Sequence, residues 1–144
     1  MANILLIDDD ELVRKTLEFA LGSAGHAVHL ASDGRDGMKK FSTLHPDLII
    51  TDIIMPHQEG IETILELRKL DALVPILAIS GAGGSGHMDF LKAATALGAT
   101  EVLRKPFSPN ALVAAVDACL RRGATRSPGA KASPPRVPNR FSDA

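Results

Sequence analysis

Five short apolar runs, each followed by a segment with helical spacing, constrain the fold of this chain more than any other feature of its sequence. The runs do not alternate between apolar and polar residues, and such runs are typical of strands that are covered on both faces. With an apolar fraction of 45%, the 144 residues can build the buried core that such strands require. The predicted strands are residues 3–7, 27–31, 47–51, 75–79 and 100–103.

The segments between the runs place apolar residues three or four positions apart, which is the spacing of one face of an α-helix. The first helix follows Asp9 and Asp10, either of which can cap it, and the last opens with Ser108-Pro109, a cap and a first-turn proline. The predicted helices lie near residues 12–21, 34–42, 61–67, 90–97 and 112–120. Strand and helix therefore alternate five times along the chain.

This alternation predicts an α/β fold of five βα units. Strand–helix–strand units form a parallel sheet with right-handed crossovers and helices on both faces, which is the doubly wound arrangement. Ligands bind such sheets beyond the carboxyl ends of the strands, where the strand order reverses. Residues at the carboxyl ends of the predicted strands are therefore the first candidates for a functional site.

The helical pattern ends near residue 122, and the composition changes there. Residues 123–144 contain four prolines and almost no apolar periodicity, which predicts a disordered, proline-rich tail. Residues 1–120 carry 10 basic and 16 acidic side chains, whereas residues 121–144 carry 6 basic and 1 acidic. We therefore expect one acidic domain over residues 1–122 and a basic tail over residues 123–144.

The sequence also bears on the compartment. No apolar run is long enough to span a membrane, and the first run stops at Asp8 without a preceding basic stretch, so no secretory signal is predicted. A lone Cys119 excludes an internal disulfide and fits a reducing compartment. Its helical spacing from Leu112 and Val116 predicts a buried thiol. We expect a cytoplasmic protein without a membrane partner.

Acidic residues stand at the ends of two predicted strands. Asp8 and Asp9 follow the first strand, and Asp52 follows the third. If these strands are neighbours, three carboxylates meet at one edge of the sheet and repel one another unless a cation lies between them. Mg²⁺ prefers oxygen ligands and takes one or two protein carboxylates together with water, so the pattern predicts a magnesium site. The alternative for Asp8 and Asp9 is a helix cap alone, which leaves Asp52 unexplained.

The ends of the fourth and fifth predicted strands add groups that suit a phosphoryl ligand. Ser80 closes the fourth run and can donate a hydrogen bond, and Lys105 follows the fifth and supplies a positive charge. A carboxylate beside a metal can attack a phosphoryl group to form an acyl phosphate, which makes Asp52 the candidate acceptor. Ser80 or Lys105 alone would be more typical of a turn or surface position; the ordered set indicates phosphoryl chemistry.

This ordered set resembles the receiver domain of a two-component response regulator, close in length to the single-domain chemotaxis regulators. The resemblance covers about residues 2–122. It rests on residues 4–9, residues 47–56 with Met55-Pro56, the Ser80-Gly81 step, residues 97–99, and Lys105-Pro106-Phe107. It implies a flavodoxin-like sheet with the strand order 2-1-3-4-5.

The resemblance also implies a role for each matching residue around the metal. Asp52 would be the phosphoacceptor and, with Asp9, a principal ligand of Mg²⁺. Asp8 would act largely through water, and the backbone carbonyl of Ile54 would complete the protein ligands.

Around the phosphoryl group, the resemblance implies that Ser80 binds it and changes rotamer, while the small Gly81 leaves room for it. Lys105 would pair with the phosphoryl oxygens, and its peptide bond to Pro106 would be cis. One departure is Val102, which stands where the family has a switch aromatic, so the signal would travel by another route.

The implied partner is a histidine kinase or a phosphotransfer protein that donates the phosphoryl group. The donor would meet the loop at residues 106–108 and the first helix, through Leu12, Arg14, Lys15, Thr16 and Phe19. Output would pass through contacts with a downstream protein that the sequence does not identify, and nucleic acid is not an expected partner. The protein would not be an enzyme beyond its self-catalysed phosphotransfer.

Two other functions remain open from the residues. An aspartyl-phosphate phosphatase of the haloacid dehalogenase type shares the strand-end aspartate and Mg²⁺, but it needs a second acid two residues after the nucleophile, where this chain has Ile54. A receiver-like module that works by docking without phosphate would not need the acceptor, the acids and the lysine together.

Overall fold

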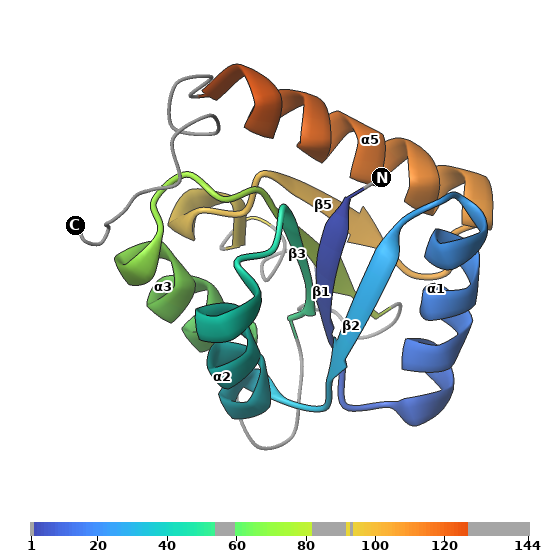
Figure 1. Ribbon diagram of the computed structural model, residues 1–144, viewed down its shortest axis with the longest axis horizontal. Coiled ribbons are helices and arrows are strands. Elements are labelled where there is room, and N and C mark those ends of the chain that lie inside the picture. Colours follow the sequence, from blue (N-terminus) through green and yellow to red (C-terminus); the bar gives the residue numbers. More distant parts are fainter. Residues whose placement is uncertain (1, 54–59, 82–91, 93, 127–144) are drawn as a thin grey trace.

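A parallel five-stranded sheet between two layers of helices forms the protein (Figure 1), in a computed structural model that describes residues 2–53, 60–81, 92 and 94–126. The strands are β1 (Asn3–Ile7), β2 (Ala27–Ala31), β3 (Leu48–Asp52), β4 (Ile76–Ser80) and β5 (Glu101–Arg104). The helices are α1 (Glu11–Ser23), α2 (Gly34–Leu44), α3 (Gly60–Leu70) and α5 (Pro109–Arg126). Residue 92 and residues 94–97 are also helical, within the predicted fourth helix. The strand order is β2-β1-β3-β4-β5, which confirms the doubly wound fold and its order.

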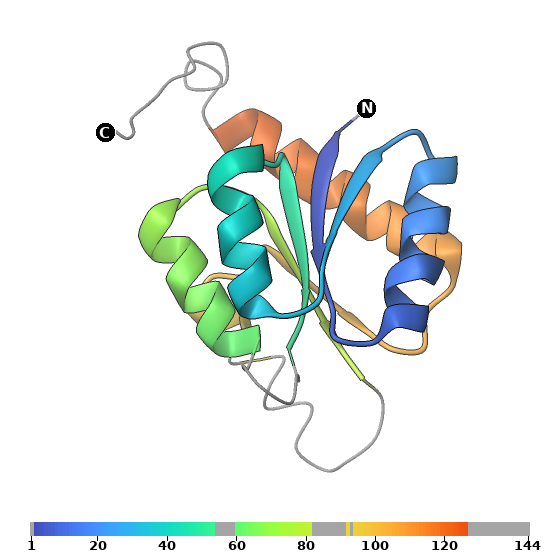
Figure 2. The ribbon, with the colours of Figure 1, turned by 60° about the horizontal axis from the view of Figure 1, so that its bottom comes forward.

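The two helical layers cover opposite faces of the sheet, as Figure 2 shows for α1 and α5 on one side and α2 and α3 on the other. Successive residues of a strand point to opposite faces, so β1 contributes Leu5 and Ile7 to one core and Ile4 and Leu6 to the other. All four side chains are fully buried. This double burial explains why β1 reads as a continuous apolar run.

Three strands are displaced from their predicted positions by one residue. β3, β4 and β5 each begin and end one residue later than the apolar runs at 47–51, 75–79 and 100–103. The reason is that backbone pairing continues past the last apolar residue, so that Asp52 lies opposite Ile79 in the ladder. Asp52 and Ser80 are therefore the last residues of their strands, where the sheet itself holds their backbones.

Side chains cap the first and last helices as the sequence predicts. Asp10 is the cap of α1, and its carboxylate accepts from the N–H groups of Leu12 at 2.9 Å and Val13 at 3.2 Å. The hydroxyl of Ser108 accepts from the N–H of Ala111 at 3.0 Å at the start of α5. Each cap satisfies donors that have no partner within the helix.

The last helix, α5, ends later than the sequence pattern predicts. The helix runs to Arg126, four residues beyond residue 122, and two of its later residues contact the rest of the domain. Arg122 donates to the carbonyl of Thr100 at 2.8 Å and pairs with Glu101 at 2.9 Å. A Cβ on Gly123 would lie only 2.7 Å from Cγ of Pro75, so a glycine permits this close approach. The rest of the predicted tail, residues 127–144, lies outside the described residues.

The structure also bears on the lone cysteine and on membrane-spanning helices. Cys119 is buried in the core beneath α5, and burial raises the pKa of its thiol to about 12, so the prediction of a buried thiol is confirmed. Among the residues that the structure describes, no helix combines the length and apolar character needed to cross a membrane.

The guanidinium of Arg68 joins three segments at the amino edge of the sheet. It donates to the carbonyl of Gly98 at 3.0 and 2.7 Å, to that of Asp71 at 3.1 Å and to that of Val74 at 2.7 Å. We expect Arg68→Met to lower the free energy of unfolding by about 2 kcal/mol, because the carbonyls lose a charged donor. Lys69→Met removes the same charge from the next, exposed position and is expected to change it by less than about 0.5 kcal/mol. Urea unfolding followed by circular dichroism measures both, and equal losses would contradict the assignment.

Candidate functional site

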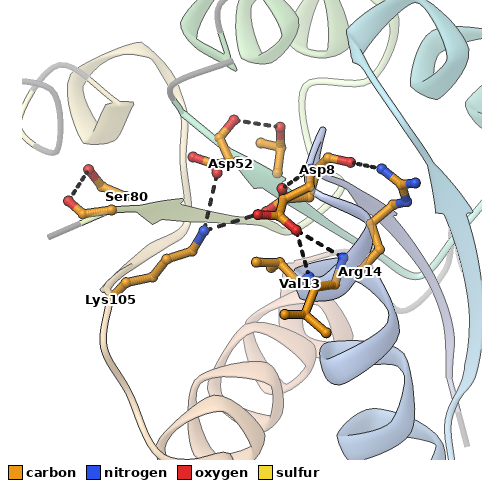
Figure 3. Close-up of polar contacts among 10 residues, drawn as sticks. Asp8, Val13, Arg14, Asp52, Ser80 and Lys105 are labelled. Carbon is orange, nitrogen blue, oxygen red and sulfur yellow. Dashed lines mark hydrogen bonds and ion pairs between the residues drawn. The ribbon is translucent and has the colours of Figure 1, made fainter. Parts of the chain in front are cut away.

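Three carboxylates meet at the carboxyl edge of the sheet, at the point where the strand order reverses, and Figure 3 shows two of them, Asp8 and Asp52, with Lys105. Asp8 follows β1 and Asp52 ends β3, and these strands are paired neighbours. Each of Asp8, Asp9 and Asp52 offers a carboxylate oxygen, and these oxygens all lie within 4.8 Å of one another. Asp8 and Asp52 are buried, with 1% and 7% of their surface exposed, whereas Asp9 is exposed. The cluster that the sequence predicts is therefore present.

Lys105 reaches this cluster from the far side of β4. Its Nζ lies 3.6 Å from Oδ2 of Asp8 and 3.3 Å from Oδ2 of Asp52, to which it donates a hydrogen bond. Because β4 separates β5 from β3, the lysine stem must pass the end of β4 at Ser80. The N–H of Lys105 donates to the carbonyl of Ser80 at 2.8 Å, and the bond to Pro106 is cis, as expected.

Ser80 is fully buried at the end of β4, beside the lysine and the acids in the sheet order. Its hydroxyl donates to the carbonyl of Gly81 at 3.5 Å, the outer limit of a hydrogen bond, so this bond is weak and easily exchanged. Ile54, whose carbonyl the resemblance makes a metal ligand, lies outside the described residues, as do Met55 and Pro56.

The cluster carries more negative charge than its one lysine can balance. Burial raises the pKa of Asp8 to about 6, and the charges of Asp52 and Asp9 add to this, against the opposing effects of the Asp10 N–H and Lys105. Burial alone would lower the pKa of Lys105, but Asp52 and Asp8 outweigh it and raise that pKa. The lysine is thus held as a cation, while the charged form of Asp8 is disfavoured. A set of crowded oxygen donors with uncompensated charge fits a divalent cation such as Mg²⁺.

The site also includes a contact that sequence reasoning missed. Arg14, expected only as part of a surface for the phosphodonor, donates from Nη1 to the backbone carbonyl of Asp8 at 2.7 Å (Figure 3). The sequence feature that could have indicated this contact is the position of Arg14 four residues after the cap Asp10, one helical turn from the acids.

Comparison with known proteins supports one family. Residues 4–117 match the family described as response regulator receiver domain. The chain is 36% identical over 129 residues to the alkaline phosphatase synthesis transcriptional regulatory protein PhoP of Bacillus subtilis, covering 89% of this chain and 52% of the relative. It is 35% identical over 119 residues to response regulator MprA of Mycolicibacterium vanbaalenii, covering 83% and 50%. The chain thus spans about half the length of these relatives.

Solved structures agree on the fold. A response regulator receiver domain protein from Clostridium thermocellum matches with a TM-score of 0.79 and 30% identity, over 85% of this chain and 96% of that one. The chemotaxis protein CheY4 of Vibrio cholerae matches with a TM-score of 0.75 and 32% identity, over 83% and 99%. With its fold, its strand-end acids and these relatives in agreement, the chain belongs to the receiver domain family of two-component response regulators.

Proposed function

We propose that this receiver domain is a phosphorylation-dependent switch in which Asp52 accepts a phosphoryl group from a phosphohistidine. The observation that carries the proposal is the position of Lys105, whose ammonium lies within 3.6 Å of carboxylates from two neighbouring strands. A carboxylate oxygen of Asp52 would form a bond to phosphorus while the bond from phosphorus to the imidazole nitrogen breaks. The electron pair of that bond leaves with the imidazole, and the product is an aspartyl phosphate.

The acids of the cluster would hold Mg²⁺ for this step. By family resemblance, Asp9 and Asp52 would be the principal ligands, Asp8 would act largely through water, and the carbonyl of Ile54 would complete the protein ligands. When bound, the ion would neutralise charge on the oxygens that are transferred. The raised pKa of Asp8 supports this proposal, because it marks negative charge that the protein alone leaves poorly compensated.

Two side chains would bind the transferred group. The ammonium of Lys105 would pair with a phosphoryl oxygen in place of the two carboxylates. This change of partner needs little motion, because the ammonium already lies between Asp8 and Asp52. Ser80 would exchange its weak bond to the Gly81 carbonyl for a stronger one to an anionic phosphoryl oxygen.

The phosphodonor, a histidine kinase or phosphotransfer protein, would dock on α1. This helix starts beside the acids and exposes two large apolar side chains, Leu12 at 75% and Phe19 at 76%. Output would follow from protein contacts, with no catalytic role beyond phosphotransfer. The relative PhoP is named as a transcriptional regulatory protein, so it gives no support to the expectation that nucleic acid is not a partner.

Incubation with acetyl phosphate followed by intact-mass measurement tests the proposal. We expect one added phosphoryl group with Mg²⁺ and none with EDTA. Borohydride reduces an aspartyl phosphate to homoserine, so peptide mapping should then find homoserine at position 52. If folded protein gains no phosphoryl group from acetyl phosphate or from a phosphohistidine donor, the domain is a docking module instead. Continuous turnover of a generic phosphate ester would instead favour the dehalogenase-type phosphatase.

A further inference from the structure

A second cation contacts the acidic cluster besides Lys105. Figure 3 draws Arg14 and Lys105 on opposite sides of Asp8. The half-buried Arg14 side chain donates from Nη1 to the backbone carbonyl of Asp8 at 2.7 Å, and the backbone N–H of Arg14 donates to the carbonyl of Asp10 at 2.9 Å. One residue of α1 therefore bonds to the chain on both sides of Asp9.

The other backbone groups of this turn are held by different partners. The N–H of Asp8 donates to the carbonyl of Ala31 in β2 at 3.1 Å, and the N–H of Asp10 donates to the carboxylate of Asp8 at 2.9 Å. The carbonyl of Asp8 belongs to the peptide unit that joins it to Asp9, so its direction sets the direction in which Asp9 leaves the turn. Arg14 is the residue that fixes this carbonyl.

Asp9 depends on its backbone for position more than the other two acids do. Asp8 and Asp52 are buried, so surrounding atoms restrict their side chains, whereas Asp9 is exposed to solvent. Its carboxylate still has an oxygen within 4.8 Å of oxygens of both other acids. A turn that is rigid on either side of Asp9 lowers the entropy that this exposed side chain loses when it binds an ion.

We propose that Arg14 is a positioning residue for the metal site, which orients Asp9 through the Asp8 carbonyl and so raises the affinity for Mg²⁺. The inference rests on the proposed function of the cluster. Two effects of Arg14 oppose each other, because a guanidinium near the acids also repels a divalent cation. Solvent around the half-buried Arg14 side chain weakens this repulsion. Losing a group that holds a metal ligand in position typically lowers the affinity for the metal 10- to 100-fold. Orientation is therefore the larger effect.

Calorimetric titration of the folded protein with Mg²⁺ tests this role. We expect Arg14→Met to raise the Kd for Mg²⁺ about tenfold. Lys15→Met is the matched control, because it removes the same charge from the next position of α1, where the lysine is exposed and lies 3.9 Å from Glu11. Its Kd is expected to stay within about twofold of the wild type. Arg14→Lys keeps the charge and one donor and is expected to recover part of the lost affinity.

The outcomes separate this inference from the proposed function. A wild-type protein that binds no Mg²⁺ would refute the proposed magnesium function. If the wild type binds and Arg14→Met binds equally well or more tightly, only the role of Arg14 is wrong. An Arg14→Lys variant as weak as Arg14→Met would also overturn it, since the donated hydrogen bond would then not be the cause. Should Arg14→Met not fold, Arg14→Gln replaces it, because glutamine is neutral and too short to reach the same carbonyl.

Discussion

The Asp52→Asn variant is expected to take up phosphoryl groups at least about 100-fold more slowly than the wild type. An amide oxygen is a far weaker nucleophile than a carboxylate, and the substitution also removes a negative ligand from the candidate Mg²⁺ site. Asp52 ends β3 with its backbone paired in the sheet, so the change of one atom leaves the strand intact. Intact-mass measurement after reaction with acetyl phosphate and Mg²⁺ gives the rate for both proteins.

The same strand provides a matched control for this variant. Asp47 lies next to the opposite end of β3, where its carboxylate accepts from the N–H of Asn3 at 2.9 Å. Asp47→Asn makes the same chemical change, keeps an oxygen acceptor for that bond, and lies at the amino edge of the sheet. It is expected to react at the wild-type rate. Undiminished uptake by Asp52→Asn, or an equal loss in both variants, would show that Asp52 is not the acceptor.

The fold could be predicted because its central strands, β1, β3 and β4, are buried on both faces. In β3 every residue is buried, and its first three residues form an apolar run that is visible without a structure. The predicted ends of the strands and helices are less accurate, because backbone hydrogen bonding rather than apolar character decides where an element ends. Asp52 belongs to its strand although it is charged, and Gly123 belongs to α5 although glycine weakens helices.

The sequence predicts the site only where the position of a residue along the chain shows which residues lie next to it in the fold. Acids at the ends of adjacent parallel strands must meet, so Asp8 and Asp52 could be paired from the sequence once the strands were recognised. The reach of Lys105 across the end of β4 depends on strand order and side-chain length together. The bond from Arg14 to a backbone carbonyl leaves no trace in residue type, because any carbonyl can accept it.

A second large effect is expected from Asp8→Asn, which should make the metal-free protein more stable while weakening its response to Mg²⁺. The pKa of Asp8 is raised in the folded protein from 3.8 to about 6, chiefly by burial, so its charged form costs free energy at neutral pH. The cost is at most about 3 kcal/mol, and the attraction of Lys105, 3.6 Å away, is already included in it. We expect a net gain of about 2 kcal/mol at pH 7.5 in EDTA. The asparagine oxygen can still accept from the N–H of Asp10.

The pH dependence follows from the direction of the pKa shift. The folded protein holds a proton on Asp8 more tightly than the unfolded chain, so this group stabilises the fold fully below pH 3.8 and loses that effect as the pH rises through about 6. The advantage of Asp8→Asn in EDTA should therefore be large at pH 7.5 and vanish near pH 4. Urea unfolding at both pH values measures it.

Asp10→Asn separates this effect from a general loss of charge. It removes one carboxylate two residues away at an exposed helix cap, where asparagine serves as well as aspartate. We expect it to keep the wild-type pH dependence and the wild-type rise in melting temperature with Mg²⁺, since ligand binding to the folded state stabilises it. In Asp8→Asn that rise should be much smaller, because the site loses one of its three carboxylates.

If Asp8→Asn were less stable than the wild type at pH 7.5 in EDTA, the charge of Asp8 would not destabilise the metal-free fold. The three acids would then be compensated within the protein, and the case for a divalent cation at this edge of the sheet would lose its electrostatic basis.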